Sequence, residues 1–204
     1  MIFFFSRVFF FIQKKYTKIK SNLFCVWCAK QMKSCGKNFR IHTTSSVLSL
    51  NRISVGDNFS TGPLLRLRAY DVFENEVYNP LISIGNDFYA GQDCSVMAVG
   101  TITIGNNVTL ASRVTIIDHS HGKGDYSDID IPVMKRRLGC KGPIIIIIED
   151  NVWLCEGVVV LSGVRIGKSS IIGANSVVTH DIPPYSIAVG IPAKVIGIVK
   201  TAKS

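Results

Sequence analysis

Aliphatic residues recur at every sixth position along the last third of the chain. The first set of such positions is Ile148, Leu154, Val160, Ile166, Ile172 and Val178. A second set of small or aliphatic residues falls within the same intervals: Val152, Val158, Val164, Ser170, Ser176 and Ile182. An α-helix repeats every 3.6 residues and an ordinary strand every 2, so neither produces this period. Short strands that alternate with corners, three to a turn, do produce it. The pattern therefore predicts an all-β protein, a parallel β-helix built from hexapeptide repeats.

The same period is visible earlier in the chain, with two-residue slips. Its apolar positions there are Cys35, Ile41, Val47 and Ile53, then Val55, Thr61 and Leu67, then Ile84, Ala90 and Val96, then Ile104, Leu110 and Ile116. Three hexads make one coil, so we expect about five or six stacked coils, each covering only its neighbours. The predicted β-helix domain covers residues 35–197, followed by a tail at 198–204.

Two segments interrupt the rhythm of the repeats. Residues 68–82 predict a loop or an irregular coil. Residues 119–143 are polar, charged and punctuated by glycine and proline, so they predict a loop extruded from the column. A long loop inside a rigid repeat is more often functional than decorative.

The first 34 residues follow a helical period instead. Apolar residues fall at three- and four-residue intervals in this segment: Phe5, Val8, Phe9, Ile12, Tyr16, Ile19 and Leu23. They predict one amphipathic helix within 1–34, flanked by lysines. The apolar run at its start is too short to span a bilayer, which takes about 20 residues, and its lysines follow rather than precede it, unlike those of a signal peptide. Three interpretations stay open: contact of residues 1–23 with an anionic membrane surface, packing against the end of the β-helix, or both together.

The overall charge narrows the range of partners. With 23 basic and 14 acidic residues the formal net charge is +9, which suits an anionic membrane surface or a phosphorylated cofactor. No nucleic-acid-binding motif accompanies it, so we expect no nucleic-acid partner. The six cysteines are scattered and no secretory cleavage site is present, which indicates a reduced, cytoplasmic protein. If the N-terminal helix contacts a membrane, we expect that contact to be with the inner face of the cytoplasmic membrane.

Four residues near the helix raise the question of zinc. Cys25, Cys28, Cys35 and His42 include the ligand types that zinc prefers. Their spacing is unusual for a zinc finger, and small apolar cysteines on a helix and in a first coil explain them as well. We therefore expect no metal.

Residues 84–197 resemble the hexapeptide-repeat acyltransferases, and among them the sugar and polysaccharide O-acetyltransferases. The motifs that carry the resemblance are VTIIDHSHG (114–122), EDNVWLCEGVVVLSGVRIG (149–167), IIGANSVVTHDIPPYSIAVG (171–190) and IPAKVIG (191–197). The resemblance implies a left-handed β-helix, a homotrimer with active sites between columns, acetyl-CoA as donor, and a sugar or glycan precursor as acceptor. An N-acyltransferase for an amino sugar and a non-catalytic β-helix scaffold are the alternatives. The DHSHG loop argues against the scaffold.

Acetyl transfer to a hydroxyl needs a base, because an alcohol is a poor nucleophile until its proton is removed. Histidine fits this role, since its unperturbed pKa is about 6.5. The match to the family motif favours His121, while His119, beside Asp118, competes for the role. Asp118 either orients an imidazole or shapes the corner of the coil.

The resemblance also implies a set of donor-site residues. The positions that match cofactor contacts in the family are Glu156, Ala174, Thr179 and His180. Lys194 is added as a partner for the phosphates of coenzyme A. The chain departs from the family pattern at Cys155, where a small residue or glycine is common, and at His180, where lysine or arginine is common.

Two residues are candidates for the acceptor site. Trp153 could form a wall of that site, although an exposed tryptophan more often packs at a subunit interface. Asp93, in AGQDCS, lies near the place where relatives hold the acceptor, and a corner carboxylate is its simpler interpretation.

Overall fold

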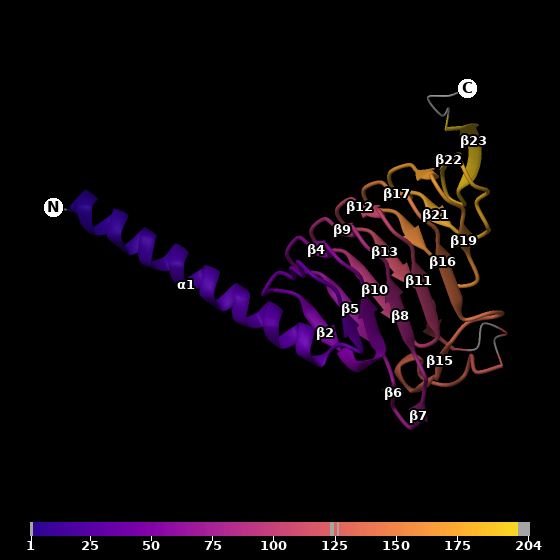
Figure 1. Ribbon diagram of the computed structural model, residues 1–204. Helices are drawn as coiled ribbons and strands as arrows, with labels where there is room; N and C mark the ends of the chain where they lie inside the picture. Colours follow the sequence, from indigo (N-terminus) through magenta and orange to yellow (C-terminus); the bar gives the residue numbers. More distant parts are fainter. Residues whose placement is uncertain (1, 123–124, 126, 200–204) are drawn as a thin grey trace.

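A single helix leads into a column of short strands in the computed structural model of the protein (Figure 1). The structure describes residues 2–122, 125 and 127–199, with side chains from residue 15 onward. The predicted tail at 198–204 therefore lies largely outside the described residues. The side chains of Phe5, Val8, Phe9 and Ile12 lie outside them as well.

The column has three faces, each a parallel sheet, which we name sheets I, II and III in the order in which the chain visits them. Sheet I consists of β1 (Ser34–Cys35), β3 (Ile53–Val55), β8 (Leu81–Ile84), β11 (Thr101–Ile104), β16 (Ile145–Ile148) and β19 (Arg165–Ile166). Sheet II consists of β4 (Ser60–Thr61), β9 (Tyr89–Ala90), β12 (Thr109–Leu110), β17 (Trp153–Leu154), β20 (Ile171–Ile172), β22 (Ser186–Val189) and β23 (Lys194–Ile198). Sheet III consists of β2 (Ser46–Leu48), β5 (Arg66–Ala69), β10 (Ser95–Ala98), β13 (Thr115–Ile117), β18 (Val159–Val160) and β21 (Val177–Val178). Only β22 and β23 pair antiparallel within these sheets.

The predicted inward positions form the core of the column. All six positions of the first set between 148 and 178 are buried, as are their counterparts at 104, 110 and 116. Ile148 pairs with Ile166, so one coil spans three hexads at this point. Ile84 pairs with Ile104, a separation in sequence that is two residues longer. The six-residue period and its two-residue slips are therefore confirmed. Near the start of the column three rings continue the core as a stack, with Phe59 between Phe39 and Phe88 at 5.2 Å from each.

Both interruptions of the repeat leave the column at the same corner, between sheet III and sheet I. The segment predicted as an irregular coil at 68–82 contains a β-hairpin, β6 (Val72–Phe73) paired with β7 (Glu76–Val77), which leaves after β5 and returns at β8. The loop predicted at 119–143 leaves after β13 and returns at β16. It contains β14 (Ser120–His121), which pairs antiparallel with β15 (Leu138–Gly139), and a short 3-10 helix at Val133–Lys135. Since β10 lies between β5 and β13 in sheet III, one coil separates the two excursions.

The carboxyl-terminal end of helix α1 (Ile2–Gln31) packs against the first coil of the column through one face of the helix. Cys28 and Met32 are buried there, and Phe24 packs against the core, together with a 3-10 turn at Leu50–Arg52. The interpretation of α1 as a cover for the end of the column is thus confirmed for this half of the helix. The remainder of the helix projects away from the column (Figure 1).

A second apolar face runs along the opposite side of α1. At 3.6 residues per turn, its members lie on the side of the helix away from Cys28. They are exposed: Tyr16, Ile19, Leu23 and Val26. No helix in the part of the chain that the structure describes is long and apolar enough to cross a membrane.

Candidate active site

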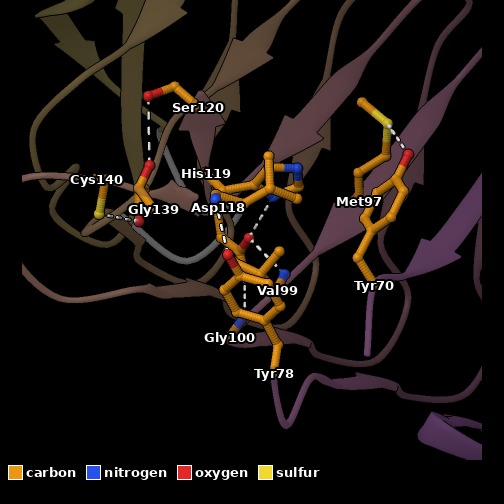
Figure 2. Close-up of polar contacts among 12 residues, drawn as sticks. Tyr70, Tyr78, Met97, Val99, Gly100, Asp118, His119, Ser120, Gly139 and Cys140 are labelled. Carbon is orange, nitrogen blue, oxygen red and sulfur yellow. Dashed lines mark hydrogen bonds and ion pairs between the residues drawn. The ribbon is translucent and has the colours of Figure 1, made fainter. Parts of the chain in front are cut away.

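The site is built around Asp118, at the point where the loop leaves the column after β13. Its carboxylate is fully buried and accepts two backbone hydrogen bonds, from Val99 N–H to Oδ1 and from Gly100 N–H to Oδ2, both at 2.9 Å (Figure 2). Both donors belong to the neighbouring coil, between β10 and β11. Asp118 therefore ties the start of the loop to the rigid part of the column.

The same carboxylate contacts an imidazole. Oδ1 of Asp118 lies 2.9 Å from Nδ1 of His119, whose side chain is only 7% exposed. A neutral imidazole with its proton on Nδ1 donates to the carboxylate and leaves Nε2 as an acceptor. The ring of Tyr70 meets the imidazole edge-on at 5.5 Å. Asp118 therefore has contacts that fit both of the roles considered for it. It bonds the backbone of the corner, and it contacts the imidazole of His119.

His121 is placed differently. It lies on β14, opposite Leu138 of β15, and its ring packs edge-on against Phe73 at 5.3 Å. Its Nδ1 is buried and has no hydrogen-bond partner among the described residues. The family motif favours His121 as base, whereas the hydrogen bonding favours His119.

A pocket of about 210 Å³ opens beside His119. It is lined by Ile117, His119, Ser120, Cys140, Leu161 and Ser162. The Cys140 thiol lies 3.2 Å from Ser162 Oγ, which donates to the carbonyl of Pro143 at 2.9 Å. Cys140 and Ser162 are not among the residues predicted from the sequence. Ser162 could have been found from the six-residue period. Ile116 and Val160 are equivalent inward residues on neighbouring coils, so the residues that follow them, His119 and Ser162, lie at the same corner.

Two of the predicted donor-site residues share this corner. Ile116 pairs with Val160, and Val160 with Val178, so the residues that follow each of them stack on successive coils. Thr179 and His180 are therefore at the same corner as His119, two coils along the column. Thr179 Oγ1 lies 2.7 Å from Nδ1 of His180, which is exposed.

The other donor-site candidates lie elsewhere on the chain. Glu156 and Ala174 occupy adjacent coils at the corner between sheets II and III, where Asn175 N–H donates to the Glu156 carbonyl at 2.8 Å. The Glu156 carboxylate forms an exposed ion pair with Arg113 at 2.9 Å. Lys194 is exposed on β23, at the far end of sheet II.

The two acceptor-site candidates are not at the His119 corner either. Asp93 lies at the corner between sheets II and III, with φ of 54°, and forms an exposed ion pair with Arg66 at 3.1 Å. Trp153 is exposed on the face of sheet II, between Thr109 and Ile171 of the neighbouring strands. Within one chain, the predicted site residues are thus divided between two corners and one sheet face.

The residues considered for zinc make packing contacts. The Cys25 thiol donates to the Ile41 carbonyl at 3.3 Å, and Nδ1 of His42 lies 2.9 Å from Thr44 Oγ1. Burial raises the pKa of the Cys28 thiol to about 11, which disfavours the thiolate that zinc requires. Over the described residues, no group of three or more potential ligands comes together.

Comparison with known proteins defines the family. The model of the bacterial transferase hexapeptide (six repeats) matches residues 145–180. The putative lipopolysaccharide biosynthesis O-acetyl transferase WbbJ of Escherichia coli is 34% identical over 148 residues, which cover 71% of this chain and 70% of that protein. The chain belongs to the hexapeptide-repeat acetyltransferase family, and the expected left-handed parallel β-helix is confirmed with it.

Other relatives are matched over less of their length. The galactoside O-acetyltransferase of Escherichia coli is 40% identical over 121 residues, 58% of this chain and 55% of that protein. The chain spans about half the length of several of the curated relatives that it matches. Among solved structures, a variant of the N-acyltransferase AntD from Bacillus cereus, in complex with dTDP-4-amino-4,6-dideoxyglucose and coenzyme A, has a TM-score of 0.68 at 21% identity. The match covers 93% of this chain and 90% of that one, and it establishes the shared fold.

Proposed function

We propose that the protein is an O-acetyltransferase that moves an acetyl group from acetyl-CoA to a hydroxyl of a sugar, such as a precursor of a surface polysaccharide. The observation that carries this proposal is the buried Asp118–His119 pair at the edge of a pocket. A carboxylate that holds one nitrogen of an imidazole leaves the other nitrogen oriented for proton transfer. WbbJ and the galactoside O-acetyltransferase supply the expected class of acceptor.

In the proposed reaction His119 acts as general base and then as general acid. Nε2 accepts the proton of the sugar hydroxyl while that oxygen attacks the thioester carbonyl of acetyl-CoA. The carboxylate of Asp118 stabilises the imidazolium that forms. When the tetrahedral intermediate collapses, the carbon–sulfur bond breaks and Nε2 returns the proton to the departing thiolate. The products are the acetylated sugar and coenzyme A, and the imidazole is again neutral.

The donor is proposed to lie along the corner between sheets III and I. Neighbouring coils are about 4.8 Å apart, so His180 lies about 10 Å along the column from His119. The acetyl end of acetyl-CoA would lie at His119, and the rest of the molecule would run past Thr179 and His180. We further propose that the active unit is a homotrimer. Its neighbouring protomer would bring Glu156, Ala174 and Lys194 to the groove, because Glu156 and Ala174 lie at a different corner of their own chain and Lys194 lies on the end strand of sheet II.

Release of coenzyme A can test the assignment of the base. With acetyl-CoA and methyl β-galactoside as probes, we expect His119→Ala to lower kcat by about 10²–10⁴-fold. His121→Ala is expected to lower it by less than about tenfold, because Nδ1 of His121 has no hydrogen-bond partner among the described residues. His42→Ala is the matched control, since His42 is exposed and lies in the first coil, between β1 and β2. If His121→Ala abolishes turnover and His119→Ala does not, the base is His121. If neither slows a measurable turnover, the mechanism is wrong.

An N-acyltransferase is the second candidate, because the AntD structure aligns with nearly the whole chain. Replacing methyl β-galactoside with dTDP-4-amino-4,6-dideoxyglucose in the same assay separates the two activities. A higher kcat/KM with the amino sugar would favour N-acylation. Absence of coenzyme A release with either acceptor would favour the non-catalytic scaffold.

We also propose that α1 contacts an anionic membrane surface. The exposed apolar face that includes Ile19 and Leu23 is accompanied by exposed lysines: Lys15, Lys18 and Lys20. A helix of this kind lies in the interface, and each lysine near an anionic surface contributes about 1 kcal/mol.

Sedimentation with vesicles that contain phosphatidylserine can test the membrane proposal. Leu23→Glu is expected to reduce the bound fraction strongly. Val77→Glu, which places the same charge at an exposed aliphatic residue of the hairpin, is expected to leave it unchanged. Equal binding by both variants would exclude this face of α1 as the contact.

A further inference from the structure

The β-hairpin at 70–78 contacts the histidine loop at three points. Tyr70 meets the ring of His119, Phe73 meets the ring of His121, and the Tyr78 hydroxyl accepts a hydrogen bond from Leu138 N–H at 2.7 Å. These contacts join segments that are far apart in sequence. They arise because both excursions leave the same corner with one coil between them (Figure 1).

The contact of Tyr78 holds the loop as a whole. Leu138 is buried and lies directly opposite His121 in the β14–β15 pair. The Leu138 N–H is on the side of β15 away from β14, where the two-stranded sheet has no further strand. The Tyr78 hydroxyl oxygen accepts this hydrogen bond in place of a strand carbonyl. The hairpin is itself fixed at its base, since Tyr78 N–H donates to the carbonyl of Asp71, whose carboxylate accepts from Ser49 Oγ at 3.0 Å.

The contacts of Tyr70 and Phe73 restrict the two rings. Among the described residues, the imidazole of His119 has one hydrogen bond, at Nδ1, and the ring can rotate about that bond unless a neighbour blocks it. Tyr70 is such a neighbour. Its hydroxyl donates to Met97 Sδ at 4.0 Å (Figure 2) and accepts a hydrogen bond from the Arg68 guanidinium at 3.4 Å. The imidazole of His121 has no hydrogen bond at Nδ1 among the described residues, so packing against Phe73 is what orients it.

We infer that the hairpin is a positioning element for the proposed reaction, with Tyr70, Phe73 and Tyr78 as positioning residues. Tyr70 limits the ring of His119, Phe73 limits the ring of His121, and Tyr78 fixes the strand that carries the loop back to the column. The inference rests on the proposed function for its catalytic consequence. Its structural content, that the hairpin orients the two imidazoles, stands without it.

Nuclear magnetic resonance of the histidine ring nitrogens tests the structural content without any turnover. The chain has four histidines, and His42 and His180 lie away from the hairpin, so they serve as internal controls. In the full chain we expect Tyr78→Phe to shift or broaden the ring signals of His121 and His119 and to leave the other two unchanged. Tyr89→Phe is the matched control, because the Tyr89 hydroxyl is exposed and makes no hydrogen bond among the described residues. A loss of general stability would affect all four histidines alike. Unchanged signals of His119 and His121 would overturn the inference.

Kinetics test the catalytic consequence with acetyl-CoA and methyl β-galactoside as probes. Misplacing a reacting group by about 1 Å costs up to 10²-fold, so we expect Tyr78→Phe to lower kcat by about 5- to 50-fold. The KM for acetyl-CoA is expected to change by less than about twofold, because the donor lies along another part of the corner. Phe73→Leu should lower kcat by no more than the limit of about tenfold expected for His121→Ala, because Phe73 acts through His121. Phe73→Tyr, which keeps the ring, should retain the wild-type kcat.

The outcomes separate this inference from the proposed function. If His119→Ala abolishes transfer while Tyr78→Phe and Phe73→Leu keep the full kcat, the hairpin has no positioning role and the proposed function stands. If the wild-type protein transfers acetyl groups to neither methyl β-galactoside nor the amino sugar, the proposed function fails, and the ring-nitrogen signals alone decide whether the hairpin orients the imidazoles.

Discussion

Replacing Asp118 with asparagine removes one acceptor from a site where three donors converge. The carboxylate is approached by Val99 N–H, Gly100 N–H and the Nδ1 side of His119. An asparagine oxygen at the Oδ1 position would still serve Val99 and His119, but its NH2 group would then face Gly100 N–H. In the flipped orientation Gly100 keeps its acceptor and the other two donors lose theirs. Either way a buried donor has no partner.

The expected cost follows from burial. An unsatisfied buried donor costs about 1–3 kcal/mol, and the lost hydrogen bonds are to a charged acceptor, so we expect Asp118→Asn to lower the free energy of unfolding by about 2–3 kcal/mol. For a chain of this size that corresponds to a fall in Tm of about 4–12 °C. The neutral amide also stabilises an imidazolium less well, and we therefore expect kcat to fall by about 10²-fold or more.

Thermal unfolding and release of coenzyme A measure the two effects on the same protein. Asp87→Asn is the matched control: Asp87 is exposed at a corner with φ of 56°, where asparagine is well tolerated, and we expect a change of less than about 0.5 kcal/mol. An unchanged Tm for Asp118→Asn would refute the account of the buried carboxylate. A lower Tm with an unchanged kcat would show that Asp118 shapes the corner and does not assist His119. A double-mutant cycle with His119→Ala then measures the coupling between the two residues.

Three further predictions concern the core and the cysteines. Phe59→Ala, at the centre of the stacked rings, should lower the free energy of unfolding by about 3–5 kcal/mol in urea, and a loss below 1 kcal/mol would mean that the coil collapses around the gap. Burial raises the pKa of Cys28 from 9.0 to about 11, so its contribution to stability is complete below about pH 9 and is lost as the pH rises through 11. Cys28→Ala should therefore lose less stability between pH 9 and 11 than the wild type, and equal losses would contradict the shift. Iodoacetamide should inhibit the enzyme by modifying Cys140 beside His119, and Cys140→Ser should keep its activity under the same treatment.

The column could be predicted from the sequence because its geometry is local. One hexad produces one strand and one corner, and inward side chains stack directly on those of the next coil, so the period of the apolar residues is the period of the structure. The six residues from Ile148 to Val178 are all buried as expected. Even the two-residue slips in the sequence appear as the longer register between Ile84 and Ile104.

The candidate site could be predicted only in part, because its contacts join segments that have no common period. The histidines and Asp118 were found from the motif, but the partners of Asp118 are backbone N–H groups of Val99 and Gly100, and any residue type can supply those. The hairpin appeared in the sequence only as a break in the rhythm. The bond between Tyr78 and Leu138 spans two irregular excursions, and neither predicts the other.

The helix shows a different reason for an incomplete prediction. Its apolar residues were assigned to a single stripe with two competing roles, as a membrane contact or as a cover for the column. The packed face includes Phe24, Cys25 and Cys28, with Met32 directly after the helix, and a cysteine is not recognised as a core residue from hydrophobic spacing alone. The exposed face that carries Leu23 lies on the opposite side. Covering the column therefore leaves the second face available, and the two roles do not exclude each other.

The position of the site at a break in the repeat has a physical reason. At the regular corners of the column, side-chain oxygens of the next coil accept hydrogen bonds from backbone N–H groups, as Asn86 Oδ1 does from Asp57 N–H at 2.8 Å. Where the chain leaves the column after β13, the Asp118 carboxylate accepts from the N–H groups of Val99 and Gly100 and so satisfies two backbone donors at the break. The rigidity of the column is thereby passed to His119 through two backbone bonds. The hairpin, one coil away at the same corner, adds a second restraint through the ring contact of Tyr70 with His119.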